Sequence, residues 1–147
     1  MQRASTRSGR ISLVLLASIV SVGLVALLVF FSGPSPKTAA AEFMSALAKG
    51  DVNKLTELST VHDKSKEEIR KEWELAVKYA PTYVFLWEIS NVQRQGDTAT
   101  VRVDLTAALY GTSPYAQPKP LQLQKVNGVW KVDVAEATRD MYPYLPQ

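Results

Sequence analysis

The sequence predicts an α+β protein in which an N-terminal transmembrane helix is followed by three helices packed on a curved four-stranded antiparallel sheet. Three observations predict this architecture. Residues 11–31 form an unbroken apolar run, residues 38–80 repeat apolar side chains every three or four positions, and residues 83–134 alternate apolar and polar side chains. Because the helical period comes first and the strand period follows it, helices and strands are expected to segregate within one domain.

Residues 11–31 predict the transmembrane helix because they contain no charge, proline or amide side chain. A helix of this length is about 31 Å long, which matches the hydrocarbon thickness of a bilayer. The leader at 1–10 carries three arginines, and the positive-inside rule then predicts a cytoplasmic N-terminus with the domain on the periplasmic or extracellular side. A cleaved signal peptide is the alternative, although the run is longer than the roughly 7–15 apolar residues of such peptides.

Charge is unevenly distributed along the 147-residue chain. Four of its 17 Lys and Arg residues lie in residues 1–37, which contain no acid, and the remaining 13 stand against 14 Asp and Glu residues. The folded domain is therefore near neutral, and no nucleic-acid partner is expected. The chain has no cysteine, which excludes disulfides and thiolate metal sites.

Two helices are expected after a proline-containing linker at 32–37. The first covers 38–49 and ends at Gly50, the residue type that most readily adopts the left-handed conformation found at helix ends. Asp51 can then cap the second helix, at 52–59, with its carboxylate.

The third helix is expected at 66–80, because Ser65 and Glu68 form an S-x-x-E capping box and Pro81 stops the helix. Its apolar side chains recur at helical spacing and predict a buried stripe: Ile69, Trp73, Ala76, Val77 and Ala80. Other positions hold acids and bases four residues apart, which is typical of a solvated helix face.

Four strands are predicted from the alternation, at 83–90, 98–110, 121–126 and 129–134. Gly96 and Asn127-Gly128 mark two tight turns, and Asn-Gly readily adopts the two positive φ angles of a type I′ hairpin. The loop at 111–120 contains three prolines and is expected to lack regular structure.

Two stretches carry a resemblance to a known family. The first reads Ala40-x-x-Phe43-x-x-Ala46-Leu47-x-x-Gly50-Asp51-x-x-x-Leu55 and the second Asn127-Gly128-Val129-Trp130-Lys131-Val132. Together they resemble the nuclear-transport-factor-2-like, or cystatin-like, superfamily, in particular its small bacterial members attached to a membrane helix. The resemblance covers residues 38–135 and leaves 136–147 as a C-terminal tail. It implies a cone in which a bent sheet surrounds a hydrophobic pocket, with functions that range from isomerases and dehydratases to small-molecule binders and interaction modules.

The sequence offers few candidates for catalysis. Enzymes of the resembled superfamily carry carboxylates, histidine or tyrosine inside the cone, but the inward positions of the strand at 98–110 are apolar: Ala99, Val101, Val103 and Leu105. His62 is expected to be a solvated loop residue beside Asp63, and a general base at the rim of the cone is the alternative. No phosphate-binding glycine loop, metal-ligand cluster or nucleophile motif occurs. No catalytic residue, metal or cofactor is therefore predicted.

Two sets of residues are candidates for binding. Five aromatic residues could line an apolar pocket or could fill the core of the domain: Trp73, Tyr83, Trp87, Tyr110 and Trp130. Contacts with a partner or with the membrane are expected from the apolar run, the proline-containing loop and the tail, at Ala17, Ser18, Ser21, Tyr115, Tyr142, Tyr144 and Leu145. For the tail, packing on its own domain is the default expectation, and contact with the lipid interface or with a partner is the alternative.

These features predict a membrane-anchored, extracytoplasmic and non-catalytic domain that acts through protein–protein contacts. The expected partners are the lipid bilayer and an integral membrane protein, for which the chain would be an accessory or assembly subunit. The alternative is a small-molecule-binding, lyase or isomerase domain that uses the apolar pocket of the cone.

Overall fold

The computed structural model describes residues 34–80, 85–107, 117–137, 142 and 144–146. The chain divides into two compact units, Met1–Gly33 and Pro34–Gln147, and all described residues belong to the second unit. The predicted transmembrane helix at 11–31 therefore lies outside the described residues. Within the described ranges, none of the helices has the length and apolar character needed to cross a membrane.

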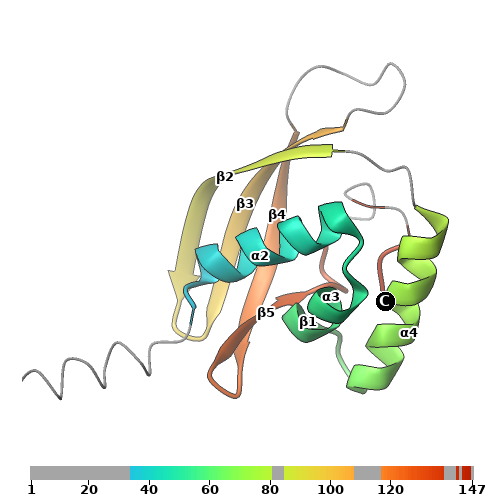
Figure 1. The fold of residues 1–147 in the computed structure, drawn as a ribbon. Coiled ribbons are helices and arrows are strands. Elements are labelled where there is room, and N and C mark those ends of the chain that lie inside the picture. Colours follow the sequence, from blue (N-terminus) through green and yellow to red (C-terminus); the bar gives the residue numbers. More distant parts are fainter. Residues whose placement is uncertain (1–33, 81–84, 108–116, 138–141, 143, 147) are drawn as a thin grey trace, which may run out of the picture. The chain divides into compact units, whose positions relative to one another are not determined.

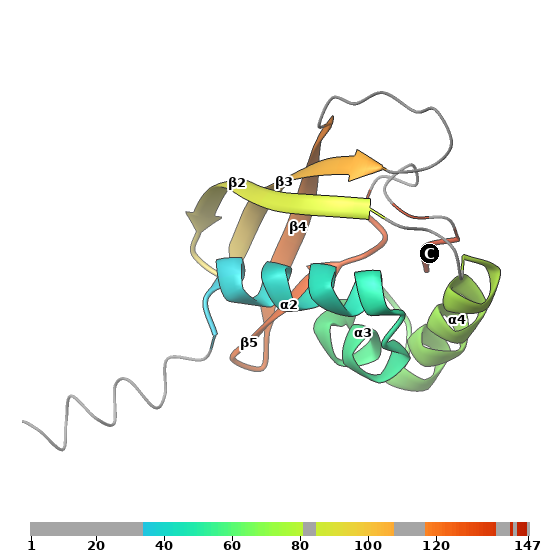
Figure 2. The same ribbon diagram turned by 45° about the horizontal axis from the view of Figure 1, so that its top comes forward.

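The described part of the second unit consists of three helices packed on a five-stranded sheet (Figures 1 and 2). The α+β class predicted from the sequence is thus confirmed. Helix α2 lies across the sheet and contacts four of its strands. In chain order the elements are α2 (Pro36–Lys49), α3 (Val52–Leu58), β1 (Ser59–Thr60), α4 (Lys66–Tyr79), β2 (Phe85–Gln95), β3 (Thr98–Ala107), β4 (Gln117–Val126) and β5 (Val129–Asp133).

The sheet has one strand more than the four that the sequence predicts. Ser59 and Thr60 form β1, which pairs in parallel with β5, so that Ser59 lies opposite Val132 and Thr60 opposite Asp133. The other strand pairs are antiparallel, and the order across the sheet is β1-β5-β4-β3-β2. Alternation cannot reveal a strand of two residues, and the predicted helix at 52–59 wrongly included Ser59.

Short-range side-chain contacts determine where the first helices begin and end. The Ser35 hydroxyl accepts a hydrogen bond from the backbone N–H of Thr38 at 3.2 Å, and the Asp51 carboxylate accepts one from Lys54 at 3.1 Å. Gly50 ends α2 with a φ of +65°. The predicted roles of Gly50 and Asp51 are therefore confirmed.

Strand β4 corrects the prediction for the loop at 111–120. It begins at Gln117, so that Pro118 and Pro120 pair with β3. Among the described strands, β5 pairs only with the Leu123–Val126 portion of β4, and the first half of β4 therefore has a described neighbour on one side only. Proline is tolerated at such an edge because its missing N–H leaves no ladder hydrogen bond unmade.

The core lies between the helices and the inner face of the sheet. The predicted alternation of β3 is confirmed, because its inward side chains are buried: Ala99, Val101, Val103 and Leu105. The helices contribute large side chains that are fully buried in the same cluster: Phe43, Met44, Leu47, Leu55 and Trp73. In the described strands, the inner face is thus covered by closely packed apolar groups.

Candidate functional site

Trp73 belongs to the core of the domain. Its side chain is fully buried, and its ring meets that of Phe43 edge-on with 6.0 Å between centroids. Its indole N–H donates a hydrogen bond to the hydroxyl of buried Ser59 at 3.0 Å. Both the ring and the N–H therefore have partners within the protein, as buried tryptophan requires.

The other aromatic residues predicted to line a pocket have different surroundings. Trp130 is buried, and the guanidinium of Arg94 lies 5.2 Å from the centre of its ring. Trp87 on β2 is half-buried against the core. Tyr83 and Tyr110 lie outside the described residues. Each of the two buried tryptophans, Trp73 and Trp130, is thus covered by side chains of its own chain.

His62 is in the solvated loop position that the sequence predicts. Its Nε2 lies 3.1 Å from Oδ2 of Asp63, and the two side chains are 91% and 85% exposed. A histidine this exposed has no apolar surroundings that would exclude water from a reacting group. In the part of the chain that the structure describes, no three His, Asp or Glu side chains converge as metal ligands would.

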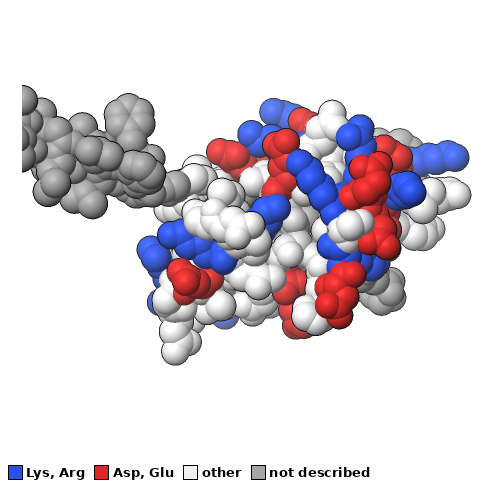
Figure 3. Space-filling view, turned by 90° about the horizontal axis from the view of Figure 1, so that it is seen from below, with Lys and Arg blue, Asp and Glu red and all other residues white. Residues whose placement is uncertain are grey.

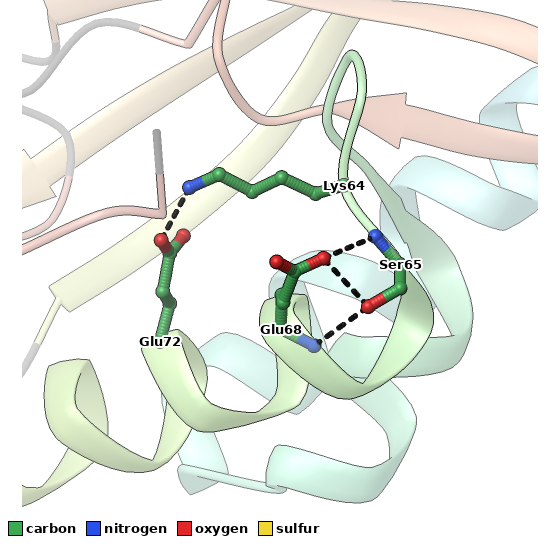
Figure 4. A network of polar contacts seen from close by, with 4 residues as sticks. All are labelled: Lys64, Ser65, Glu68 and Glu72. Atoms are coloured by element: carbon green, nitrogen blue, oxygen red, sulfur yellow. Dashed lines mark hydrogen bonds and ion pairs between the residues drawn. The ribbon is translucent and has the colours of Figure 1, made fainter.

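A polar network surrounds the start of α4 (Figure 4). The hydroxyl of Ser65 accepts a hydrogen bond from the backbone N–H of Glu68 at 3.3 Å, and the Glu68 carboxylate accepts one from the backbone N–H of Ser65 at 2.8 Å. The predicted capping box is therefore confirmed. Hydrogen bonds from the Ser65 hydroxyl and then from its backbone N–H hold the pKa of the Glu68 carboxyl below its usual value of 4.5. Beside this box, Lys64 and Glu72 form an ion pair.

An apolar groove lies between α4 and the C-terminal tail, and we call it the α4–tail groove. It encloses about 460 Å³ and is lined by Lys64, Glu72, Leu75, Tyr79, Tyr144, Leu145 and Pro146. Three of its apolar side chains are largely exposed, namely Leu75 (53%), Tyr79 (60%) and Tyr144 (66%). Exposed apolar side chains that are grouped in this way are typical of a contact surface.

Two tyrosines from distant parts of the sequence meet at this groove. Tyr79 is the last residue of α4, and its ring centroid lies 5.5 Å from that of Tyr144, with 48° between the ring planes. Tyr144 has a φ of +59°, a left-handed backbone conformation that is unfavourable for a residue with a Cβ. Lys78 contributes a positive charge at the rim, because its Nζ lies 5.9 Å from the centre of the Tyr79 ring.

The described tail residues differ in what they contact. Tyr142 is buried, and its ring meets that of Phe85 edge-on with 6.3 Å between centroids. Leu145 is also buried. Of the three described tail residues that were predicted to make contacts, Tyr144 is therefore the one that exposes its side chain to solvent. The remaining predicted contact residues lie outside the described residues: Ala17, Ser18, Ser21 and Tyr115.

Leu75 and Tyr79 are residues of the groove that the sequence prediction missed. They stand four residues apart on α4, outside the buried stripe, among charged neighbours. Two apolar residues at this spacing lie on one side of a helix and can indicate a second contact face. That signal is present in the sequence, whereas the return of the tail to α4 depends on tertiary packing.

Charges of both signs are mixed on the surface. Figure 3 shows Lys and Arg side chains interspersed with Asp and Glu, without a broad region of one sign on the face that it displays. Exposed ion pairs join Lys54 to Glu42 and Arg70 to Glu74, each at 3.2 Å. This face therefore lacks the continuous basic surface on which nucleic-acid binding depends.

Comparison with known proteins finds solved structures that are similar to the chain, but no similar sequence family. No family model matches the chain, and no curated protein matches it. The chain is similar to a candidate calcium/calmodulin-dependent protein kinase type II association domain from Thiobacillus denitrificans, with 12% identity over 68% of this chain and 90% of that chain and a TM-score of 0.52. At this identity the likeness concerns the fold alone.

Two further solved structures are similar to the chain at lower scores. One is a nuclear-transport-factor-2-like protein of unknown function from Cytophaga hutchinsonii, with 9% identity over 73% of this chain and 93% of that chain and a TM-score of 0.42. The other is a candidate polyketide cyclase from Sinorhizobium meliloti, with 17% identity over 65% of this chain and 93% of that chain and a TM-score of 0.43.

Proposed function

We propose that this chain is a membrane-anchored, extracytoplasmic and non-catalytic domain that acts through protein–protein contacts, as an accessory or assembly subunit of a membrane protein complex. The apolar run at 11–31 supports the anchor, and the arginines of the leader at 1–10 support a cytoplasmic N-terminus. The α4–tail groove supplies the contact surface in this proposal.

The observation that carries the proposal is the exposure of Leu75, Tyr79 and Tyr144 at one groove. Each exposes more than half of its side chain to solvent, and the three line the same hollow. Burial of such side chains against a partner removes apolar surface from water, which is the main driving force for association. Tyrosine is in addition one of the residue types that most often dominate binding energy at interfaces.

A lyase or isomerase is supported less well by the described residues. Such an enzyme needs an acid or base beside its substrate in a site shielded from water. The inward side chains of β3 are apolar and closely packed, and the single histidine lies in a loop with its side chain in solvent. These features favour contact with a macromolecule over chemistry inside the cone.

Purification of the full chain from native membranes in a mild detergent tests the proposal. We expect an integral membrane protein to co-purify at a constant ratio. With the double variant Tyr79→Ser/Tyr144→Ser, we expect the amount of this co-purified protein to fall at least tenfold. Leu86→Ser is the matched control, because Leu86 is 70% exposed on β2 and does not line the groove. A chain that purifies alone, or that appears intact in the aqueous fraction after cell breakage, contradicts the proposal.

A further inference from the structure

We propose that the α4–tail groove binds an extended, uncharged, proline-containing segment of a partner protein. This inference rests on the proposed function, because it names the kind of partner segment that the contact surface accepts. It is carried by the contact of the tyrosine pair, by the backbone of Tyr144, by the balance of charge in the groove and by the chemistry of the tail segment that lines it.

The tyrosine pair provides the surface on which proline packs. With 5.5 Å between ring centroids and 48° between ring planes, Tyr79 and Tyr144 pack against each other and form one continuous aromatic surface, and both residues are open to solvent. Aromatic-lined grooves of this kind bind segments in the polyproline II conformation, which are already extended before they bind. Such a segment makes no internal hydrogen bonds, so its carbonyl groups can accept hydrogen bonds from the tyrosine hydroxyls.

The backbone of Tyr144 holds its ring in this exposed position. Its φ of +59° lies in the left-handed region, while the next residue, Leu145, is buried. Unfavourable backbone conformations persist where the surrounding packing imposes them, and they concentrate at functional sites. Here the conformation places an aromatic ring in water beside Tyr79 and not in the core.

The charges of the groove favour an uncharged occupant. Of the seven lining residues, Lys64 and Glu72 are charged, and they form an ion pair with each other (Figure 4). A charged ligand would have to compete with this pair, whereas an uncharged segment leaves it intact. Lys78 at the rim of the Tyr79 ring disfavours a cationic ligand in addition.

The tail shows that the surface of α4 already accepts a segment of this chemistry. Leu145 and Pro146 line the groove from the tail, and both are buried. The partner segment would lie alongside them and extend the same apolar contact over Leu75 and Tyr79. Little rearrangement is then required, which limits the entropic cost of binding.

The test measures binding of a fluorescein-labelled decaproline peptide to the full chain in detergent micelles by fluorescence anisotropy. We expect saturable binding of decaproline and none of a Gly-Ser peptide of the same length. Tyr79→Ala and Tyr144→Ala should each weaken binding at least tenfold, Tyr79→Phe should weaken it only a few-fold, and Leu86→Ala should leave it unchanged. Equal binding of the two peptides, no binding of decaproline, or full affinity in Tyr79→Ala overturns the inference.

Three further readouts distinguish the inference from its rivals. If a membrane partner co-purifies but decaproline does not bind, the proposed function stands and this inference fails. If decaproline binds and no partner co-purifies, the proposed function fails and the groove is still shown to bind a proline-containing segment. Loss of decaproline binding when the chain is moved from micelles to phosphatidylcholine nanodiscs would assign the groove to the bilayer and overturn the inference. A dimer of the wild-type chain that dissociates in the Tyr79→Ala variant would assign the groove to a second copy of the chain and would also overturn the inference.

Discussion

The indole N–H of Trp73 on α4 donates a hydrogen bond of 3.0 Å to the hydroxyl of Ser59 on β1, and both side chains are buried. This contact joins the third helix to the short strand that extends the sheet. Replacement of Ser59 by alanine removes the acceptor and leaves the N–H without a partner in the core. We therefore expect Ser59→Ala to lower the free energy of unfolding by about 1–3 kcal/mol.

Urea unfolding of the full chain in detergent, followed by tryptophan fluorescence, measures this loss. Ser90→Ala is the control, because the Ser90 hydroxyl donates an exposed hydrogen bond of 3.4 Å to a backbone carbonyl, and its loss should change stability by less than about 0.5 kcal/mol. In the Trp73→Phe background the donor is absent, so Ser59→Ala should cost much less there. An equal cost in both backgrounds would show that the hydrogen bond is not the source of the effect.

The capping box predicts a dependence of stability on pH. Hydrogen bonds from Ser65 hold the pKa of folded Glu68 below 4.5, so the charged carboxylate is favoured in the folded state. Its contribution to stability is therefore present above pH 4.5 and is lost as the pH falls through the lower pKa of the folded protein. Comparison of wild type with Glu68→Gln between pH 3 and 7 should show a difference in unfolding free energy that shrinks below pH 4.5. A difference that is constant with pH contradicts this assignment.

Gly50 and Gly96 allow the cost of a steric clash to be separated from the cost of a positive φ. Their φ angles are +65° and +61°, and alanine in this conformation costs about 1–2 kcal/mol at either position. A Cβ at position 50 would also lie 3.0 Å from Cγ1 of Val77, whereas a Cβ at position 96 would meet nothing within 4 Å. Thermal unfolding should therefore show Gly50→Ala to be less stable than Gly96→Ala, and the difference should shrink in the Val77→Ala background.

Features encoded by a few consecutive residues were predictable from the sequence. Gly50, Asp51 and the Ser65–Glu68 capping box act on their own backbone neighbours, so their residue types are sufficient to place the helix ends. The inward face of β3 was predictable for a similar reason, because the alternation of side chains continues along the strand.

Features that depend on a distant partner were not predictable. Strand β1 has two residues, and its partner β5 lies more than 60 residues away in the sequence. The register of β2 on β3 shifts between Ile89 and Asn91, so that Asn91 and not Ser90 lies opposite Arg102, and no local pattern indicates such a bulge. The α4–tail groove combines residues 75 and 79 with residues 144–146, which only tertiary packing brings together.

The contact between Arg94 and Trp130 gives a prediction with a spectroscopic readout. The guanidinium carbon of Arg94 lies 5.2 Å from the centre of the Trp130 ring, and its Nε donates a hydrogen bond of 3.0 Å to the carbonyl of Gly96, which holds it in place. Trp130 is buried under this cover. Arg94→Ala should therefore admit water to the indole ring, shift tryptophan emission to longer wavelength and lower the free energy of unfolding by about 0.5–1 kcal/mol.

Two control variants identify Trp130 as the source of the emission shift. Arg102→Ala removes an exposed arginine from the neighbouring strand β3, and it should leave the emission maximum unchanged because Arg102 faces away from the core. In the Trp130→Phe background, Arg94→Ala should no longer shift the emission, because Trp73 is buried elsewhere and Trp87 keeps its half-buried position. A shift that persists without Trp130 would mean that loss of Arg94 loosens the sheet as a whole. Iodide quenching then separates the two cases, because local uncovering makes one indole accessible, whereas general loosening raises quenching of all three tryptophans.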